Sequence, residues 1–197
     1  PTTNNSSSPD PSNLSWHDLW EVAMGCRKCP LCENRNNVVF GDGNRNADLM
    51  FIGEGPGRDE DMQGLPFVGK AGQLLTKMIT AMQFTREEVY IANIIKCRPP
   101  NNRNPLPEEA AACLPYLKRQ IQLVNPKAIV ILGAVPLQFL FNRRGVTRLR
   151  GTWLDYEGIP AMVTFHPAFL LRYPQDKRKA WSDLQQVMKK FDKVYKP

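Results

Sequence analysis

The chain has no apolar run approaching the roughly 20 residues that a membrane-spanning helix needs. Its start carries no basic–apolar–small pattern of the kind that marks a secretory signal peptide. Cysteine is scarce and odd in number, with 5 in 197 residues, which argues against a secreted disulfide framework. These absences predict that the protein has no membrane partner and is cytoplasmic.

What the chain does have is an ordinary globular composition with excess positive charge. Hydrophobic residues make up 42% and charged residues 23%, which suits a soluble domain with a sizeable core. The formal charge of +7 favours nucleic acid as a partner, although a basic surface tuned for solubility gives the same number. Arginine matches phosphate oxygens, so a basic cluster in the last third predicts a phosphate-binding surface as an alternative to a solvated face. This cluster comprises Arg143, Arg144, Arg148, Arg150, Arg172, Lys177, Arg178 and Lys179.

The chain divides into a polar start and a body in which strand and helix patterns alternate. Residues 1–13 have no apolar residue to bury, which predicts a disordered tail followed by one domain over 14–197. Apolar runs predict sheet strands at 48–52, 89–95, 127–132 and 161–165, with a short strand at 38–40. Helical spacing predicts helices at 16–24, 70–82, 107–124, 134–141 and 176–194. Strands separated by helices indicate an α/β fold whose parallel sheet is covered on both faces.

A glycine-rich loop follows the predicted strand at 48–52. It reads Gly53-Glu54-Gly55-Pro56-Gly57, continues with three carboxylates at 59–61, and reaches Phe67 before the helix at 70–82. Glycines let the backbone approach a ligand closely, and loops at strand ends are where open α/β sheets bind ligands. A tight structural turn with a solvated acidic face is the alternative. We favour a binding loop because glycines, carboxylates and a lone aromatic occur together.

Four of the five cysteines form two pairs that could close around one metal centre. Cys26 and Cys29 are two residues apart, Cys97 follows the second predicted strand, and Cys113 lies in the helix predicted at 107–124. Zinc and an iron–sulfur cluster both accept four thiolates, so the spacing leaves both open, together with buried unligated thiols. Cys32 is the odd cysteine.

Five sequence blocks then follow one another in a specific order. They are Gly53–Gly57 with Glu60-Asp61, Pro66-Phe67-Val68-Gly69-Lys70-Ala71-Gly72, the strand ending in Asn93, Lys96–Arg103, and Phe165-His166-Pro167 with Leu170-Leu171-Arg172. With the cysteines, these blocks resemble the family 4 uracil-DNA glycosylases, the iron–sulfur branch of the uracil-DNA glycosylase superfamily. The resemblance covers about residue 26 to the C-terminus. It implies a three-layer α/β/α fold with a central four-stranded parallel sheet.

The resemblance also implies the reaction, the cofactor and the partner. The reaction would be hydrolysis of the N-glycosidic bond of uracil in DNA, which leaves an abasic site and initiates base excision repair. No lysine matches a lyase position, so we expect a monofunctional enzyme. A [4Fe–4S] cluster would be held by Cys26, Cys29, Cys97 and Cys113. The partner would be uracil-containing DNA, double- or single-stranded, and we expect the protein to be a monomer.

Roles for individual residues follow from the same resemblance. Phe67 would stack on a uracil flipped out of the helix, and Asn93 would read its N3–H and O4 together. His166 would lie against uracil O2 and stabilise the anion that forms as the C–N bond breaks. The base would also be bound by the backbone of Glu54, Gly55 and Pro56, although Pro56 has no N–H to donate.

Water activation and DNA distortion are assigned to further residues. Glu60 is our first candidate for positioning the water or stabilising the sugar cation, and Glu54 is the second. Leu170 and Leu171 are predicted to fill the space vacated by the flipped base, with Leu170 as the preferred tip.

Two other classes of function fit parts of the sequence. A metal-dependent phosphoesterase or nuclease would use the carboxylates of 54–61 to hold a divalent ion and would lose activity in EDTA. A non-catalytic DNA-binding module would account for the positive charge, but phosphate binding alone would not require Phe67, Asn93 and His166.

Overall fold

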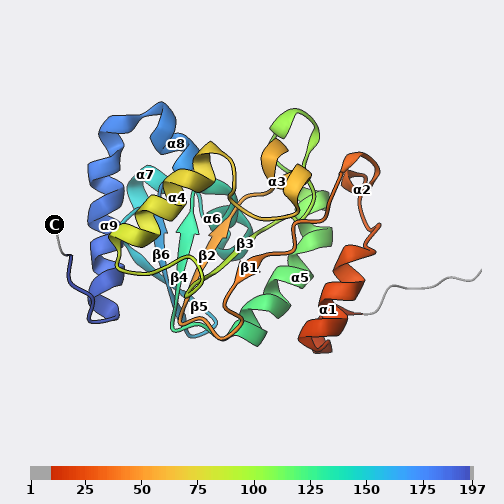
Figure 1. Cartoon of the computed structure of the whole chain (residues 1–197), viewed down its shortest axis with the longest axis horizontal. Coiled ribbons are helices and arrows are strands. Elements are labelled where there is room, and N and C mark those ends of the chain that lie inside the picture. Colours follow the sequence, from red (N-terminus) through yellow and green to blue (C-terminus); the bar gives the residue numbers. More distant parts are fainter. Residues whose placement is uncertain (1–9, 196–197) are drawn as a thin grey trace, which may run out of the picture.

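A six-stranded sheet forms the centre of the computed structural model, which describes residues 10–195 (Figure 1). The strand order is β1-β3-β2-β4-β6-β5. The four inner strands are parallel, whereas the edge strands β1 and β5 pair antiparallel with their neighbours. The strands are β1 (Asp42–Gly43), β2 (Leu49–Gly53), β3 (Tyr90–Asn93), β4 (Ala128–Leu132), β5 (Trp153–Tyr156) and β6 (Ile159–Thr164).

Helices cover both faces of this sheet. The α-helices are α1 (Trp16–Met24), α2 (Leu31–Asn34), α3 (Arg58–Gln63), α4 (Lys70–Ala81), α5 (Pro107–Val124), α6 (Ala134–Phe141), α7 (Val146–Leu149), α8 (Pro167–Arg172) and α9 (Lys177–Lys190). Three short 3₁₀ helices are η1 (Pro11–Asn13), η2 (Pro100–Asn102) and η3 (Pro174–Asp176). Local chemistry sets the bounds of the longest helix: Pro107 occupies its first position, and Asn125 ends it in the left-handed region.

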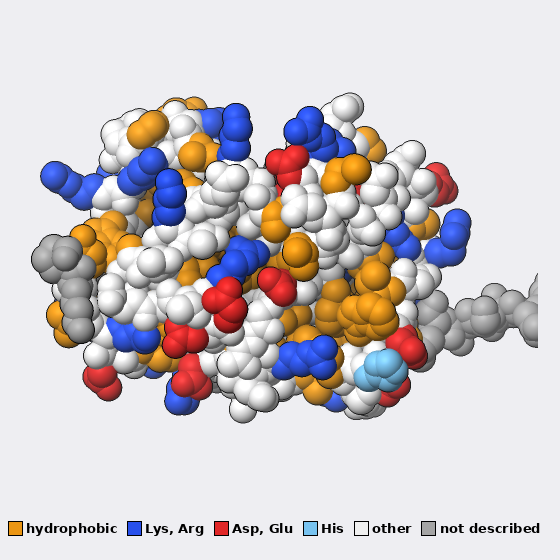
Figure 2. Space-filling view, viewed as in Figure 1, with side chains coloured by type: hydrophobic (Ala, Val, Ile, Leu, Met, Phe, Trp, Pro, Cys, Tyr) orange, Lys and Arg blue, Asp and Glu red, His pale blue; other side chains and the backbone are white. Residues whose placement is uncertain are grey.

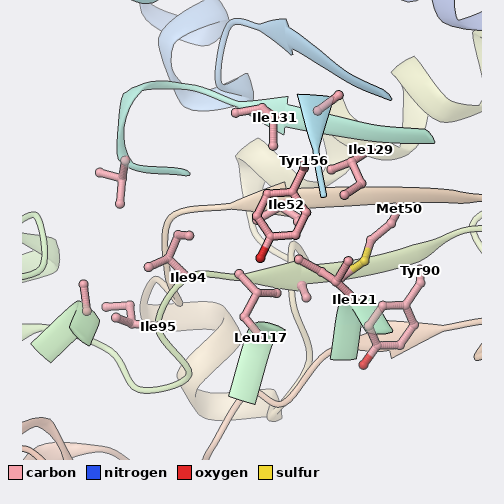
Figure 3. Close-up of a cluster of buried hydrophobic side chains, with 14 of the residues drawn as sticks. Met50, Ile52, Tyr90, Ile94, Ile95, Leu117, Ile121, Ile129, Ile131 and Tyr156 are labelled. Carbon is pink, nitrogen blue, oxygen red and sulfur yellow. The ribbon is translucent and has the colours of Figure 1, made fainter. Parts of the chain in front are cut away.

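Alternation along the inner strands supplies apolar side chains to both faces. In β2, Met50 and Ile52 pack with side chains of α5 and α6, and Figure 3 shows this cluster around Leu117. Leu49 and Phe51 face the other way and pack with α4 and α9. All five residues of β2 and of β4 are buried, as expected for parallel strands between two helical layers.

The α/β fold, the four parallel strands and the five longer helices predicted from the sequence are confirmed, with boundaries shifted by a few residues. The sheet gains two edge strands that were not predicted. The short strand expected at 38–40 was wrong, although the Val39 N–H donates to the Lys96 carbonyl at 2.8 Å. Residues 58–63, expected as part of a loop, form α3.

The prediction of a disordered tail over 1–13 falls mainly on residues outside the described part. Of its residues, 10–13 are described: Asp10 caps η1, and Pro11 is buried. Just beyond, the Arg119 Nε atom donates to the Leu14 carbonyl at 2.8 Å, which ties this segment to α5. Within residues 10–195, no helix is both long enough and apolar enough to cross a bilayer.

Candidate active site

A cleft of about 1040 Å³ opens at the carboxyl ends of the parallel strands. Its walls come from the loop after β2, from the segment 99–104, from the starts of α3, α4, α6 and α7, and from α8. In Figure 2 the upper outline of the molecule is notched between two groups of Lys and Arg side chains. This is the edge where open α/β sheets bind ligands, because the turns between strands and helices gather there.

Phe67 is held in a strained backbone conformation on one wall of the cleft. Its φ of 52° lies in the left-handed region, which bulky residues rarely adopt. The Arg86 guanidinium donates to the carbonyls of Pro66 and, at 3.1 Å, of Phe67. A Cβ at Gly72 would lie 1.9 Å from the Phe67 carbonyl carbon, so only glycine permits this approach. The loop is therefore built to fix the direction of one aromatic ring.

Asn93 ends β3 beside this ring. It pairs in register with Gly53 of β2, and a Cβ at Gly53 would lie 2.5 Å from Phe67 Cζ and 2.6 Å from Asn93 Oδ1. Asn93 is 1% exposed, and its Oδ1 has no hydrogen-bond partner among the described residues. A buried acceptor left unpaired costs free energy, so this oxygen is suited to a ligand donor. Asn93 is not among the residues that line the open cleft itself.

His166 also lies beside the Phe67 ring, at the N-cap of α8. The two ring centroids are 5.6 Å apart with an interplanar angle of 34°. The Ala168 N–H donates to His166 Nδ1 at 3.1 Å, which leaves the proton of the neutral ring on Nε2. Burial of the ring, helped by the nearby Arg172 charge, lowers the pKa of His166 to about 4. At neutral pH this histidine is a neutral hydrogen-bond donor.

The two glutamates proposed as catalytic have different surroundings. Glu60 accepts hydrogen bonds from the backbone N–H groups of Val68 at 2.9 Å, Gly69 at 2.8 Å and Gly57 at 3.2 Å. These hydrogen bonds hold Gly57, before α3, close to Val68 and Gly69, directly after Phe67. Glu54 lines the cleft, and burial raises the pKa of its carboxyl with no hydrogen bond opposing the shift. Glu54 is therefore the carboxylate free to bind a water molecule.

The remaining carboxylates of this stretch belong to α3. Asp61 is buried and accepts hydrogen bonds from the Asn36 side chain and, at 2.9 Å, from the Asn36 backbone. Asp59 lines the cleft and forms an ion pair with Arg58 at 3.2 Å. No group of three or more His, Cys, Asp or Glu side chains within residues 10–195 is arranged to hold a metal ion. In this stretch Asp61 holds the Asn36 segment, whereas Asp59 lies at the cleft.

The two leucines predicted as a DNA wedge are adjacent on α8 and differ in exposure. Leu170 is 1% exposed and packs with Phe165 and Ala180. Leu171 is 42% exposed. The burial of Leu170 disfavours it as the tip: adjacent positions on a helix point about 100° apart, and here the core takes Leu170 and leaves Leu171 outside.

The basic cluster predicted in the last third is divided between different roles. Arg172 lines the cleft. Arg150 instead donates to the buried Asp183 carboxylate, with Nε at 3.0 Å, so its role is structural. Three basic residues outside this cluster also line the cleft: Arg58, Lys70 and Arg103.

The sequence interpretation missed two residues that support the site. Arg86 belongs to no motif and to no predicted binding loop. Its hydrogen bonds to the Pro66 and Phe67 carbonyls could not be predicted from the sequence. Gly133 has φ 93°, and a Cβ there would lie 2.9 Å from His166 Cβ. Gly133 follows a buried strand, as Gly53 follows the strand predicted at 48–52. This shared position at a strand end could have identified it from the sequence.

All five cysteines line a second, smaller cavity, between the segment around α2 and the middle of α5. Arg35 Nη1 donates to Cys97 Sγ at 3.2 Å, and the Lys96 backbone N–H donates to Cys113 Sγ at 3.3 Å. Burial raises the pKa of Cys113 to about 12 and also raises that of Cys97. The sulfurs surround a space rather than meeting at one point, an arrangement that suits a multi-atom group held by several thiolates.

Comparison with known proteins identifies relatives of this chain. Residues 40–185 match the family model described as the uracil DNA glycosylase superfamily. A type-4 uracil-DNA glycosylase of Thermotoga maritima is 50% identical over 155 residues, covering 77% of this chain and 81% of that protein. Type-4 enzymes of Archaeoglobus fulgidus and Sulfurisphaera tokodaii are each 42% identical, covering 88% of this chain and 92% and 83% of those proteins.

Proposed function

Because the chain belongs to the uracil DNA glycosylase superfamily, we propose that it removes uracil from DNA by hydrolysing the N-glycosidic bond. The product would be an abasic site, the first intermediate of base excision repair, with no cut in the strand. The observation that carries the proposal is the meeting of three side chains from distant parts of the sequence. Phe67 and His166 face each other, and the unpaired Asn93 oxygen lies beside the Phe67 ring.

Recognition of uracil follows from the hydrogen-bonding groups of Asn93. Its Oδ1 would accept from uracil N3–H, and its Nδ2 would donate to O4. Cytosine carries an acceptor at N3 and a donor at position 4, so the same side chain would reject it. Phe67 would stack on the ring, which contributes about 1–3 kcal/mol per base in comparable sites. The base reaches this depth only when flipped out of the duplex, at a cost of a few kcal/mol.

His166 and Glu54 supply the catalytic groups. As the C–N bond breaks, negative charge develops on uracil O2 while the sugar becomes cationic. The neutral His166 would donate Nε2–H to that oxygen, which favours the transition state over the ground state because the charge forms there. Glu54 would orient the attacking water and stabilise the cation, whereas Glu60 would act by holding the loop. The backbone N–H of Gly55 completes the base-binding wall.

The rim of the cleft suits a DNA backbone. Arg58, Lys70 and Arg172 offer cations to phosphates on both sides of the cleft, and the exposed Leu171 is suited to fill the stack left by the flipped nucleotide. Single- and double-stranded DNA both carry a phosphate backbone, so these cations would bind either form. The expected monomeric state and cytoplasmic location stay predictions.

The cysteine cavity suits an iron–sulfur cluster. We propose that Cys26, Cys29, Cys97 and Cys113 hold a [4Fe–4S] cluster, which would pin the segment around α2 onto α5. Two observations support the fit: the sulfurs line one cavity, and N–H donors already face Cys97 and Cys113. Donors of this kind stabilise thiolate ligands. No catalytic step is assigned to the cluster.

The test incubates the purified protein with a uracil-containing oligonucleotide in EDTA, followed by alkali. A cut that develops only after alkali treatment supports the proposal, because alkali cleaves abasic sites. Activity abolished by EDTA would favour a metal-dependent phosphoesterase instead. The variant Phe67→Ala separates excision from binding: uracil release should fall by the equivalent of about 1–3 kcal/mol, with general DNA affinity retained. An intact strand in every uracil context would refute the assignment.

A further inference from the structure

A buried lysine lies between the two cavities. Lys96 is 2% exposed, follows Asn93 by three residues, and immediately precedes Cys97. An ammonium group this deep in a protein is costly unless its donors are satisfied. Two of its donors are: Nζ donates to the Asn93 carbonyl at 3.0 Å and to Gln120 Oε1 at 2.6 Å.

The bond to Asn93 holds the end of a strand. β3 stops at Asn93, and beyond it the chain leaves the regular pairing of the sheet. The neighbouring Ile94 N–H still donates to the Gly53 carbonyl at 3.0 Å. The Asn93 carbonyl is bound instead by the Lys96 ammonium. The orientation of this peptide sets where the Asn93 side chain points, since side-chain direction depends on the local backbone.

The bond to Gln120 extends the arrangement into a network. Gln120 is fully buried in α5, and its Nε2 donates to the Phe40 carbonyl at 2.9 Å and to Tyr90 Oη at 3.0 Å. Both hydrogens of that amide are therefore used, which leaves its oxygen directed at Lys96. Satisfied buried networks of this kind specify one side-chain arrangement.

The same lysine lines the wall of the cysteine cavity, and its backbone N–H donates to Cys113 Sγ. We propose that Lys96 is a positioning residue for uracil recognition, fixing the peptide of Asn93 from the side of the cysteine cavity. The inference rests on the proposed function of Asn93. Lys96 would not contact the substrate, because its side chain is buried and does not line the cleft.

The test compares Lys96→Met with the wild-type protein, and all five cysteines are retained in both. Methionine keeps a long apolar side chain but cannot donate to Asn93. We expect kcat/KM for uracil excision to fall about 10- to 100-fold, the range seen when supporting contacts behind a binding residue are lost. Inhibition by free uracil should weaken by a similar factor, while affinity for DNA without uracil stays unchanged. A purely structural role would lower stability without moving uracil inhibition.

Two further variants test how the effect on uracil inhibition changes with distance from Lys96 along the network. Gln120→Met removes the second acceptor of Lys96 and should weaken uracil inhibition less than Lys96→Met does. Tyr90→Phe removes only the outer hydrogen bond to Gln120 and is the matched control, with uracil inhibition within about twofold of wild type because Lys96 keeps both acceptors. If Lys96→Met does not fold, the comparison of Gln120→Met with Tyr90→Phe decides.

Unchanged uracil inhibition in Lys96→Met, or equal inhibition in Gln120→Met and Tyr90→Phe, would overturn the positioning role while leaving uracil excision standing. A wild-type protein that neither excises nor binds uracil would overturn the proposed function, and the role of Lys96 with it.

Discussion

The cleft and the cysteine cavity lie at opposite ends of the segment that runs from Asn93 to Cys97, and they are built differently. The cleft holds a strained Phe67 and a histidine kept neutral, and the buried Asn93 oxygen beside Phe67 has no hydrogen-bond partner among the described residues. In the cysteine cavity, the sulfurs of Cys97 and Cys113 already accept hydrogen bonds from N–H donors. A site that must bind and release a substrate keeps groups unsatisfied, whereas a site that holds a permanent group satisfies them.

The largest expected effect separates the two glutamates of the cleft. Glu54→Gln should lower kcat by about 10²- to 10⁴-fold with little change in thermal stability, because it removes the carboxylate free to orient water. Glu60→Gln should instead cost about 1.5–3 kcal/mol of unfolding free energy, because charge-assisted hydrogen bonds to the loop are weakened. Kinetics and thermal melting of both variants check this division. The reverse pattern would make Glu60 the catalytic carboxylate.

The next prediction concerns His166. His166→Ala should lower kcat by about 10²- to 10³-fold, the range for loss of one donor to a developing anion. His17→Ala is the matched control, because the side chain of His17 is 76% exposed on α1, where it pairs with Glu21. Single-turnover excision rates of both variants measure the effect. Equal rates for the two would remove His166 from the mechanism.

Substitution in the cysteine cavity should act on stability more than on chemistry. Cys97→Ser should lower the iron content and the melting temperature, because metal binding contributes to folding. Cys32→Ser should keep both, since Cys32 is the cysteine outside the proposed ligand set. Iron per chain and visible absorption are the measurements. A Cys32→Ser protein that loses iron would show that the ligand set is wrong.

The smallest effect is the expected pH dependence. The pKa of His166 is lowered to about 4, below the usual value of 6.5, so the folded protein favours the neutral ring. The stability contributed by this neutral state is complete above pH 6.5 and declines as pH falls toward 4. The His166 contribution to kcat should therefore stay constant between pH 8 and pH 5.5. A decline centred near pH 6.5, absent in His166→Ala, would contradict the neutral assignment.

The sequence predicted the main elements of the fold because long apolar runs and long helical patterns are set by burial. The α4 and α5 boundaries agree within a residue or so, helped by Gly69 before one helix and Pro107 in the other. Short elements such as α3 and β5 were missed. Their few residues carry too little periodicity, and tertiary contacts determine them.

The sequence motifs singled out residues that the structure brings close together, whereas their roles stay predictions. Phe67, Asn93 and His166 were found from motifs, and the parallel sheet explains why they meet. Which leucine of α8 is exposed depends on helix phase against the core. The loop-holding role of Glu60 depends on backbone N–H groups eight and nine residues away, which sequence patterns do not reveal.

The central claim is that Phe67, Asn93 and His166 form one pocket for a single pyrimidine ring. A crystal structure of the protein with bound uracil tests this most directly. The account predicts the ring stacked on Phe67, N3 within hydrogen-bond distance of Asn93 Oδ1, and O2 facing His166 Nε2. Uracil bound elsewhere, or in the cleft without contact to Asn93, would contradict it.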